Sequence, residues 1–242
     1  MAVKKAHTPT EPVETEHHVV RRARGFWDKN SKPVIYIGSV IILLIAGWYA
    51  YRQFIKLPAE QKANEAVFPV QKSFQNFASA TTDTLKGMLA TQCLNGDGGS
   101  NIGAVKFMSK YSGTDAANLC HYYAGACYLN LKQYDKAVKE LSDFSTSATQ
   151  IQSRAYGMMG DAYSELKKND DALSYYKKAA DVNTKDEFTS SEYLFRAGLF
   201  AEAIGKKKEA IDLFKTIKEK YPLSEKGTDI DRYLARLGEV NE

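Results

Sequence analysis

The sequence predicts an all-α protein: one N-terminal transmembrane helix, then an α-solenoid of helical hairpins, closed by a C-terminal capping helix. Three observations predict this fold class. They are a charge-free apolar run near the N-terminus, apolar residues spaced three and four apart further on, and a hairpin pattern that recurs three times. The composition agrees, because 44% hydrophobic residues in a chain of 242 supply enough apolar side chain for a folded core.

The apolar run fills residues 33–51 and contains no charged residue. As a helix that rises about 1.5 Å per residue it would span roughly 28 Å, close to the ~30 Å hydrocarbon core of a bilayer. The alternatives are a buried core helix and a cleaved signal peptide, but a signal peptide has a shorter apolar region and a small-residue cleavage site. We therefore expect an uncleaved transmembrane helix over residues 33–56. Aromatic residues, which favour the headgroup region, lie toward both ends: Trp27, Tyr36, Trp48, Tyr49 and Tyr51.

Basic residues flank this run unequally. The nineteen residues before it hold five Lys or Arg and the nineteen after it hold three, which favours a cytoplasmic N-terminus. The first 32 residues show no apolar periodicity, so we expect a disordered basic cytoplasmic tail over residues 1–32.

A helical hairpin recurs three times in the C-terminal part of the chain. Each copy has a Gly in its first helix, an Ala twelve residues later in its second helix, and a large residue after that Ala. Two antiparallel helices approach closely only where small residues lie at their crossing, so each set marks one hairpin. The three sets are Gly125, Ala137 and Leu141; Gly160, Ala172 and Tyr176; and Gly198, Ala210 and Phe214.

These hairpins divide residues 57–242 into repeat units. We expect clear units at 118–152, 153–190 and 191–222, and a capping helix at 224–240 that covers the open end of the stack. A degenerate first unit at 57–117 is expected to hold one helix from Glu60 to Phe77 and another from Ile102 to Tyr111, with a Gly-rich connection between them.

The small and aromatic positions of these units resemble the tetratricopeptide repeat, a 34-residue helical hairpin, and the last unit ends with that family's proline in Lys220-Tyr221-Pro222. The layout of tail, span and repeats, with the strings from Ile102 to Phe107 and from Ala117 to Tyr123, resembles the bacterial YfgM-type proteins. This resemblance implies a single-pass protein of the bacterial inner membrane with a periplasmic repeat domain. It also implies association with the Sec translocon (SecYEG) and with a membrane-anchored periplasmic chaperone of the PpiD type, and hence a scaffold or co-chaperone function.

The tetratricopeptide resemblance also assigns a partner-binding groove to the first helix of each hairpin. Aromatic rings beside isolated charges hold extended peptides through apolar contacts and directional hydrogen bonds. Stacking or solvated positions are the alternative role for these residues. The assigned positions are Tyr122, Ala126, Leu129, Arg154, Asp161, Glu192, Phe195 and Leu199.

Two other functions stay open at this stage. One is an N-anchored receptor with cytosolic repeats, although the Lys and Asn clamp of such receptors is replaced here by Tyr122, Ala126 and Met158. The other is a scaffold for envelope assembly or cell division.

No catalytic constellation is found, so we expect no enzyme activity and no cofactor. The Gly-rich segment 95–100 lacks the Lys of a phosphate loop and the regularly spaced oxygen ligands of an EF-hand, which favours an interhelical turn. We expect no metal site, because His17 and His18 lack a third ligand and His121 is expected to pack within a first helix.

Charge and cysteine content exclude two further classes. Beyond residue 32 the chain has 26 basic and 25 acidic residues, so it lacks the excess positive charge of a nucleic-acid-binding protein. Three cysteines cannot build a disulfide framework, and we expect Cys93, Cys120 and Cys127 to be small buried hydrophobes.

Overall fold

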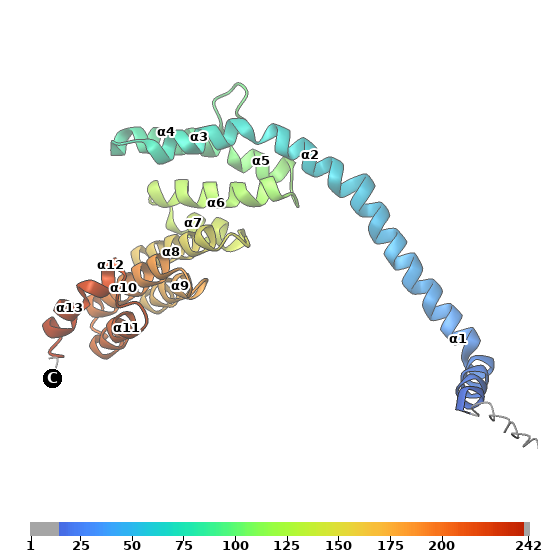
Figure 1. Ribbon diagram of the computed structural model, residues 1–242. Coiled ribbons are helices and arrows are strands. Elements are labelled where there is room, and N and C mark those ends of the chain that lie inside the picture. The colour runs from blue at the N-terminus through green and yellow to red at the C-terminus, as the bar shows by residue number, and fades with distance from the viewer. Residues whose placement is uncertain (1–14, 240–242) are drawn as a thin grey trace, which may run out of the picture. The chain divides into compact units, whose positions relative to one another are not determined.

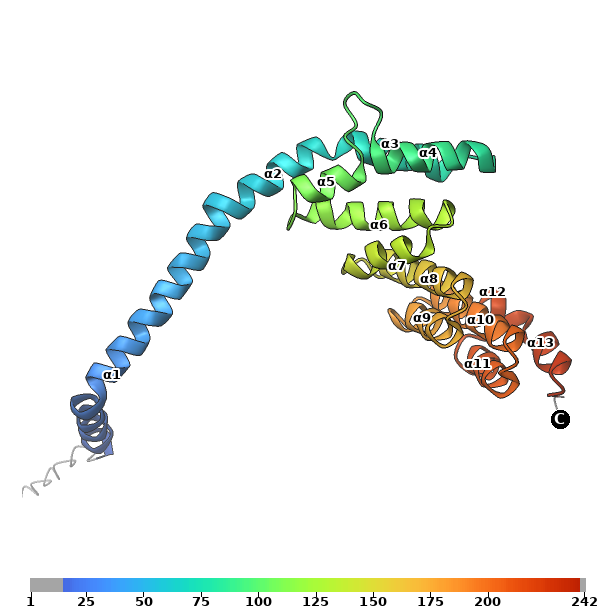
Figure 2. The same cartoon turned by 180° about the vertical axis from the view of Figure 1, so that it is seen from behind.

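The computed structural model describes residues 15–239, and all regular secondary structure within that range is helical. The chain divides into two compact units, Met1–Pro58 and Ala59–Glu242. Figures 1 and 2 show the ribbon from opposite sides, and each unit is described by itself.

The N-terminal unit is one apolar helical segment. It comprises α1 (Thr15–Tyr51), with Pro33 inside it, and the short π-helix η1 (Arg52–Lys56). The segment Ser31–Ala66 is long and apolar enough to cross a membrane, and no residue of its most apolar window is buried in the protein. A span is therefore compatible with its length and composition.

The expected disordered tail differs from what the structure contains. Residues 1–14 lie outside the described residues, whereas Thr15–Lys32 belong to α1. Glu16, Ala23 and several arginines in this stretch are strong helix formers, and the stretch from Thr15 to Lys32 contains no proline. Once the apolar segment nucleates a helix, each further residue extends it at little cost, so the helix begins before the apolar run.

The first part of the C-terminal unit holds more helices than expected. One helix was predicted from Glu60 to Phe77, but the helix is interrupted at Val67. The cause is Pro69, which lacks an N–H and whose ring opposes continuation of the preceding helix. The stretch predicted as a connection contains a further helix that begins at its N-cap Thr82. The four helices are α2 (Leu57–Ala66), α3 (Phe68–Ser79), α4 (Asp83–Asn95) and α5 (Ala104–Lys110).

The Gly-rich segment forms a turn between α4 and α5. Asp97 Oδ1 accepts hydrogen bonds from the backbone N–H groups of Gly99 at 2.8 Å and Asn101 at 3.1 Å. Gly96 and Gly103 have φ values of 88° and 80°, and a Cβ at either position would lie within 2.5 Å of backbone atoms. Glycine is therefore required at both positions.

The three predicted hairpins are present and stack in sequence order (Figures 1 and 2). A Cβ built on Gly125, Gly160 or Gly198 would lie 2.5, 2.6 or 2.3 Å from the nearest atom of Leu141, Tyr176 or Phe214, respectively. The predicted crossings are thus confirmed. The helix pairs are α6 (Asp115–Asn130) with α7 (Tyr134–Asp143), α8 (Thr149–Glu165) with α9 (Asn169–Asp181), and α10 (Glu187–Ala203) with α11 (Lys207–Lys220).

Each hairpin turn contains one residue in the left-handed region of backbone space. It is Lys132 in the first, Lys167 in the second and Gly205 in the third, with φ values of 59°, 60° and 81°. Only the glycine adopts this conformation without a steric cost from its Cβ. The two lysine turns are therefore locally strained.

Two short helices close the C-terminal end of the stack, where one helix was predicted. They are α12 (Glu225–Thr228) and α13 (Ile230–Arg236), with Asp229 between them. The poor helix formers Gly227 and Thr228 end α12 at this point. Ile230 and Leu234 of α13 are buried in the same apolar cluster as Phe214 and Ile217 of α11. The last hairpin is thereby covered.

Candidate partner-binding face

The first helices α6, α8 and α10 carry all eight residues predicted to line a groove. We call the side chains that these helices and α12 bring together the first-helix face. It consists of Tyr122, Ala126, Leu129, Arg154, Asp161, Glu192, Tyr193, Phe195, Arg196, Leu199 and Lys226.

The α6 portion of this face is mostly packing surface. Tyr122 is only 7% exposed and Ala126 9%, and the Tyr122 ring lies 5.3 Å from that of Phe144 and 6.0 Å from that of Phe74. Burial raises the pKa of the Tyr122 hydroxyl, which the adjacent Arg154 guanidinium partly opposes. Tyr122 and Ala126 therefore offer a ligand little surface, while Leu129 is half-buried.

Arg154 of α8 is exposed, and its charge is felt by two tyrosines. Its charge acts on Tyr122 of α6 and on Tyr193 of α10, and burial raises the pKa of both tyrosines. None of the described carboxylates forms an ion pair with Arg154. Its guanidinium thus keeps donors free for a ligand.

Asp161 of α8 is already engaged within its own hairpin. Its Oδ1 accepts a hydrogen bond of 2.7 Å from the Tyr176 hydroxyl of α9. Burial raises the pKa of the Asp161 carboxyl, against the lowering effect of that hydrogen bond and of the Arg196 charge. The contact ties α8 to α9 next to the Gly160 crossing.

The α10 portion of the face meets the C-terminal cap. Glu192 accepts a hydrogen bond of 2.7 Å from Arg196 Nε and pairs with Lys226 Nζ at 3.3 Å. Lys226 Nζ lies 5.3 Å from the centroid of the Phe195 ring, and the Tyr233 ring meets Phe195 edge-on at 4.7 Å. Glu192 and Phe195 are half-buried here, as is Leu199.

Three residues of the face were missed by sequence reasoning: Tyr193, Arg196 and Lys226. A Cβ on Gly157 of α8 would lie 2.3 Å from Tyr193 Cε1, so the ring crosses α8 at that glycine, and Arg196 Cζ lies 5.4 Å from the ring centroid. The second glycine of α8, three residues before Gly160, was the available signal that another large side chain lies close.

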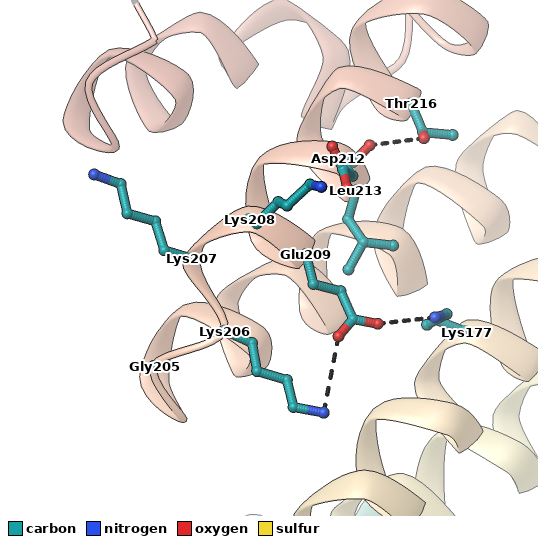
Figure 3. A pocket seen from close by; sticks show the side chains of 9 residues that line it. All are labelled: Lys177, Gly205, Lys206, Lys207, Lys208, Glu209, Asp212, Leu213 and Thr216. Carbon is teal, nitrogen blue, oxygen red and sulfur yellow. Dashed lines mark hydrogen bonds and ion pairs between the residues drawn. The ribbon is translucent and has the colours of Figure 1, made fainter.

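A separate depression of about 710 Å³ lies on the second helices (Figure 3). It is lined by Lys177 of α9 and by residues of the α10–α11 turn and of α11, and it contains none of the predicted groove residues. Lys177 Nζ pairs with Glu209 Oε1 at 2.9 Å, and Lys206 pairs with Asp170 at 2.6 Å. The charges of these two pairs compensate one another.

Antiparallel helical hairpins of similar length follow one another in this chain. Each pair of helices crosses at a glycine, and the first helices stack on one face. This arrangement defines an α-solenoid repeat protein. Comparison with protein families identifies the repeats: tetratricopeptide repeat models match residues 120–147, 153–186 and 192–224. The chain therefore contains tetratricopeptide repeats, and such repeats are generally non-catalytic scaffolds for protein–protein interaction. No curated protein matches the chain.

Proposed function

We propose that this protein is a non-enzymatic, membrane-anchored scaffold that holds an extended segment of a protein partner on its first-helix face. The observation that supports this function is the exposed Arg154, which forms no ion pair with a described carboxylate and whose charge acts on Tyr122 and Tyr193. A guanidinium offers donors in a fixed planar fork that matches a carboxylate, and neighbouring rings supply apolar contact. An acidic side chain of the partner fits this position.

The proposed location is the inner membrane of a bacterium, with the N-terminus in the cytoplasm and the repeats in the periplasm. The support is the apolar segment Ser31–Ala66 together with the excess of Lys and Arg before the charge-free run. Protease added to spheroplasts should digest the repeats. Their protection until the cells are lysed would reverse the orientation.

The proposed partners are the Sec translocon (SecYEG) and a membrane-anchored periplasmic chaperone of the PpiD type. Support comes from the order of tail, apolar segment and repeats. It also comes from the two strings, Ile102 to Phe107 and Ala117 to Tyr123, that resemble YfgM-type proteins. The protein would act there as a scaffold or co-chaperone that keeps a client or chaperone close to the exit of the translocon.

The experiment is a binding titration of full-length protein in detergent against each purified candidate partner. Hydrogen bonds to charged groups contribute ~1.5–3 kcal/mol, so Arg154→Glu should weaken binding by roughly 10- to 100-fold. Lys139→Glu is the matched control, since Lys139 is an exposed cation on the second helix α7. Circular dichroism must show the parental helix content in both variants.

The outcomes separate the two parts of the proposal. Failure of the unsubstituted protein to bind either partner contradicts the translocon assignment. Binding that Arg154→Glu leaves unchanged, or that Lys139→Glu weakens equally, contradicts the first-helix face as the binding surface. Tyr122 is a poor choice for this test, because a substitution there would damage the packing of α6.

A further inference from the structure

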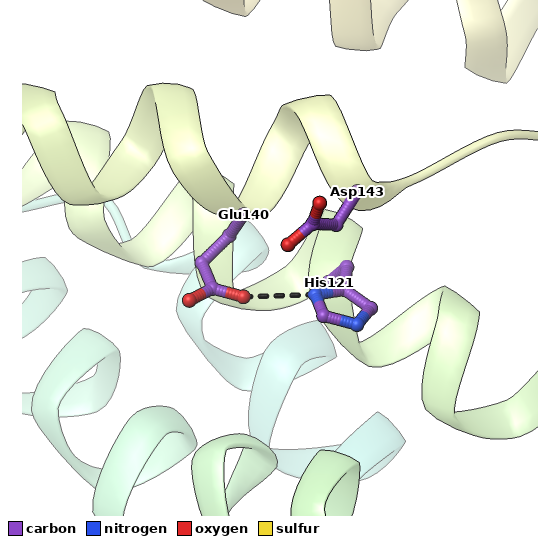
Figure 4. Close-up of side chains that lie close together, drawn as sticks. All are labelled: His121, Glu140 and Asp143. Atoms are coloured by element: carbon purple, nitrogen blue, oxygen red, sulfur yellow. Dashed lines mark hydrogen bonds and ion pairs between the residues drawn. The ribbon is translucent and has the colours of Figure 1, made fainter. Parts of the chain in front are cut away.

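Three side chains that bind metals in other proteins converge on the hairpin of α6 and α7. His121 projects from α6, and Glu140 and Asp143, three residues apart on one side of α7, face it (Figure 4). Their candidate ligand atoms all lie within 4.8 Å of one another, and His121 Nδ1 is 2.8 Å from Glu140 Oε2.

The charge at this cluster is not balanced by neighbouring cations. Among the described residues, no Lys or Arg forms an ion pair with Glu140 or Asp143, and Glu140 is hydrogen-bonded to the His121 imidazole. The side chain of Glu140 is only 15% exposed and that of His121 26%. The partly desolvated carboxylate of Glu140 and the exposed one of Asp143 therefore face one imidazole, which favours a bound cation.

The cluster opens onto a depression that leaves room for further ligands. His121 and Asp143 line this depression of about 290 Å³, together with Asp115 and Asn118 from the first turn of α6. A metal held at its inner edge would keep solvent-accessible positions for water or for another oxygen ligand.

We propose that His121, Glu140 and Asp143 form a binding site for one divalent first-row transition-metal ion, with Zn²⁺ as the representative. One imidazole nitrogen and two carboxylates are ligands that Zn²⁺ accepts at ~2.0–2.2 Å, whereas Mg²⁺ and Ca²⁺ favour sites made of oxygen alone. Binding uses the lone pair of Nδ1 with the imidazole proton on Nε2, so the hydrogen bond between Nδ1 and Glu140 gives way to two metal–ligand bonds.

The geometry requires only a local adjustment. Ligand atoms around a tetrahedral Zn²⁺ lie about 3.3 Å apart, given the metal–ligand distances of such sites. Asp143 is the exposed member of the three and lies at the last residue of α7, so rotation of its side chain closes the set. The ion would then join the first and second helices of the first clear repeat.

The test is calorimetric titration of full-length protein in detergent with ZnCl₂. His7, His17 and His18 are replaced by Gln throughout, so that His121 is the single histidine able to contribute to the measured heat. One Zn²⁺ should bind per chain, with no heat of binding from MgCl₂ at the same concentrations. His121→Gln and Asp143→Asn should each weaken Zn²⁺ binding at least ~10-fold, since even outer-shell changes at metal sites cost ~10–100-fold.

Asp135→Asn is the matched control, because Asp135 is an exposed carboxylate in the first turn of the same helix. It should leave the Zn²⁺ affinity unchanged, and His121→Gln keeps a hydrogen-bond donor for Glu140 so that the hairpin stays folded. Circular dichroism and thermal melts of the metal-free proteins check this. Equal Zn²⁺ affinity in the parent, His121→Gln and Asp143→Asn proteins, or no binding at a 1:1 ratio, would overturn the site.

Discussion

Gly160→Ala tests the closest helix crossing of the second clear repeat. The added methyl group would lie 2.6 Å from Tyr176 Cε1 and 2.7 Å from Cδ1, well inside van der Waals contact. The Tyr176 ring has no free space to move into, because it is 6% exposed and its hydroxyl donates a 2.7 Å hydrogen bond to Asp161. The helices α8 and α9 must therefore separate, or that hydrogen bond must break.

Two opposing effects determine how much Gly160→Ala changes the free energy of unfolding. Alanine gains ~1 kcal/mol over glycine in a helix interior, whereas overpacking of a well-filled core costs ~1–3 kcal/mol. Gly87→Ala isolates the first effect, because a Cβ on Gly87 in α4 meets nothing within 4 Å. Gly160→Ala should thus be less stable than Gly87→Ala by ~1–3 kcal/mol, which corresponds to a gap of roughly 2–12 °C in melting midpoint for a domain of this size.

The assay is thermal unfolding of full-length protein in detergent, followed by circular dichroism at 222 nm. In a Tyr176→Ala background the difference between the two alanine variants should disappear, because the ring that opposes the methyl group is gone. Equal stabilisation by Gly160→Ala and Gly87→Ala in the parent background would refute the assigned crossing.

Three further predictions concern the turns, one helix cap and the thiols. Lys167→Gly should raise the melting midpoint by relieving ~1 kcal/mol of left-handed strain, while Lys168→Gly should not; equal effects would exclude strain at that turn. Asp186→Ala should cost ~1 kcal/mol at pH 7 in urea unfolding, because Asp186 caps α10 through a 3.1 Å hydrogen bond from the Thr189 N–H. That hydrogen bond lowers the pKa of Asp186, so its stabilisation is complete above the ordinary value of about 3.9 and fades below it; a gap unchanged at pH 2.5 would contradict the cap. Burial raises the pKa of the Cys120 thiol to about 12, so Ellman's reagent should modify it at pH 8 only after denaturation, and rapid labelling of folded protein would show that α6 opens.

The hairpin register was predictable from the sequence because a close crossing restricts residue size directly. Gly160 and Ala172 have to be small, and Tyr176 has to fill the space beside them, whatever the rest of the fold does. The helix α4 was not predicted, because its sequence lacks a comparable restriction on residue size and its apolar residues do not form one stripe. Its exposed Leu85 and Met88 lie on the other side from its buried apolar residues, which blurs the helical periodicity.

The side-chain environment of the face was only partly predictable. The tetratricopeptide resemblance placed Tyr122 in the groove, but the rings that bury it come from Phe74 and Phe144, distant in sequence. The meeting of His121 with Glu140 depends in the same way on how α6 and α7 pack. Periodicity assigns a residue to one side of a helix, whereas its exposure depends on neighbours contributed by other elements.

Site-specific photocrosslinking in native membranes tests most directly whether the first-helix face binds the partner. A photoreactive phenylalanine at Ile151, which is 39% exposed and one turn before Arg154 in α8, reports on the face without removing that arginine. The same group at Lys139 on α7 reports on the second helices. The account predicts a discrete crosslinked protein from position 151, lost on Arg154→Glu, and none from position 139. A crosslink from position 139 alone, or one from position 151 that persists in Arg154→Glu, would contradict it.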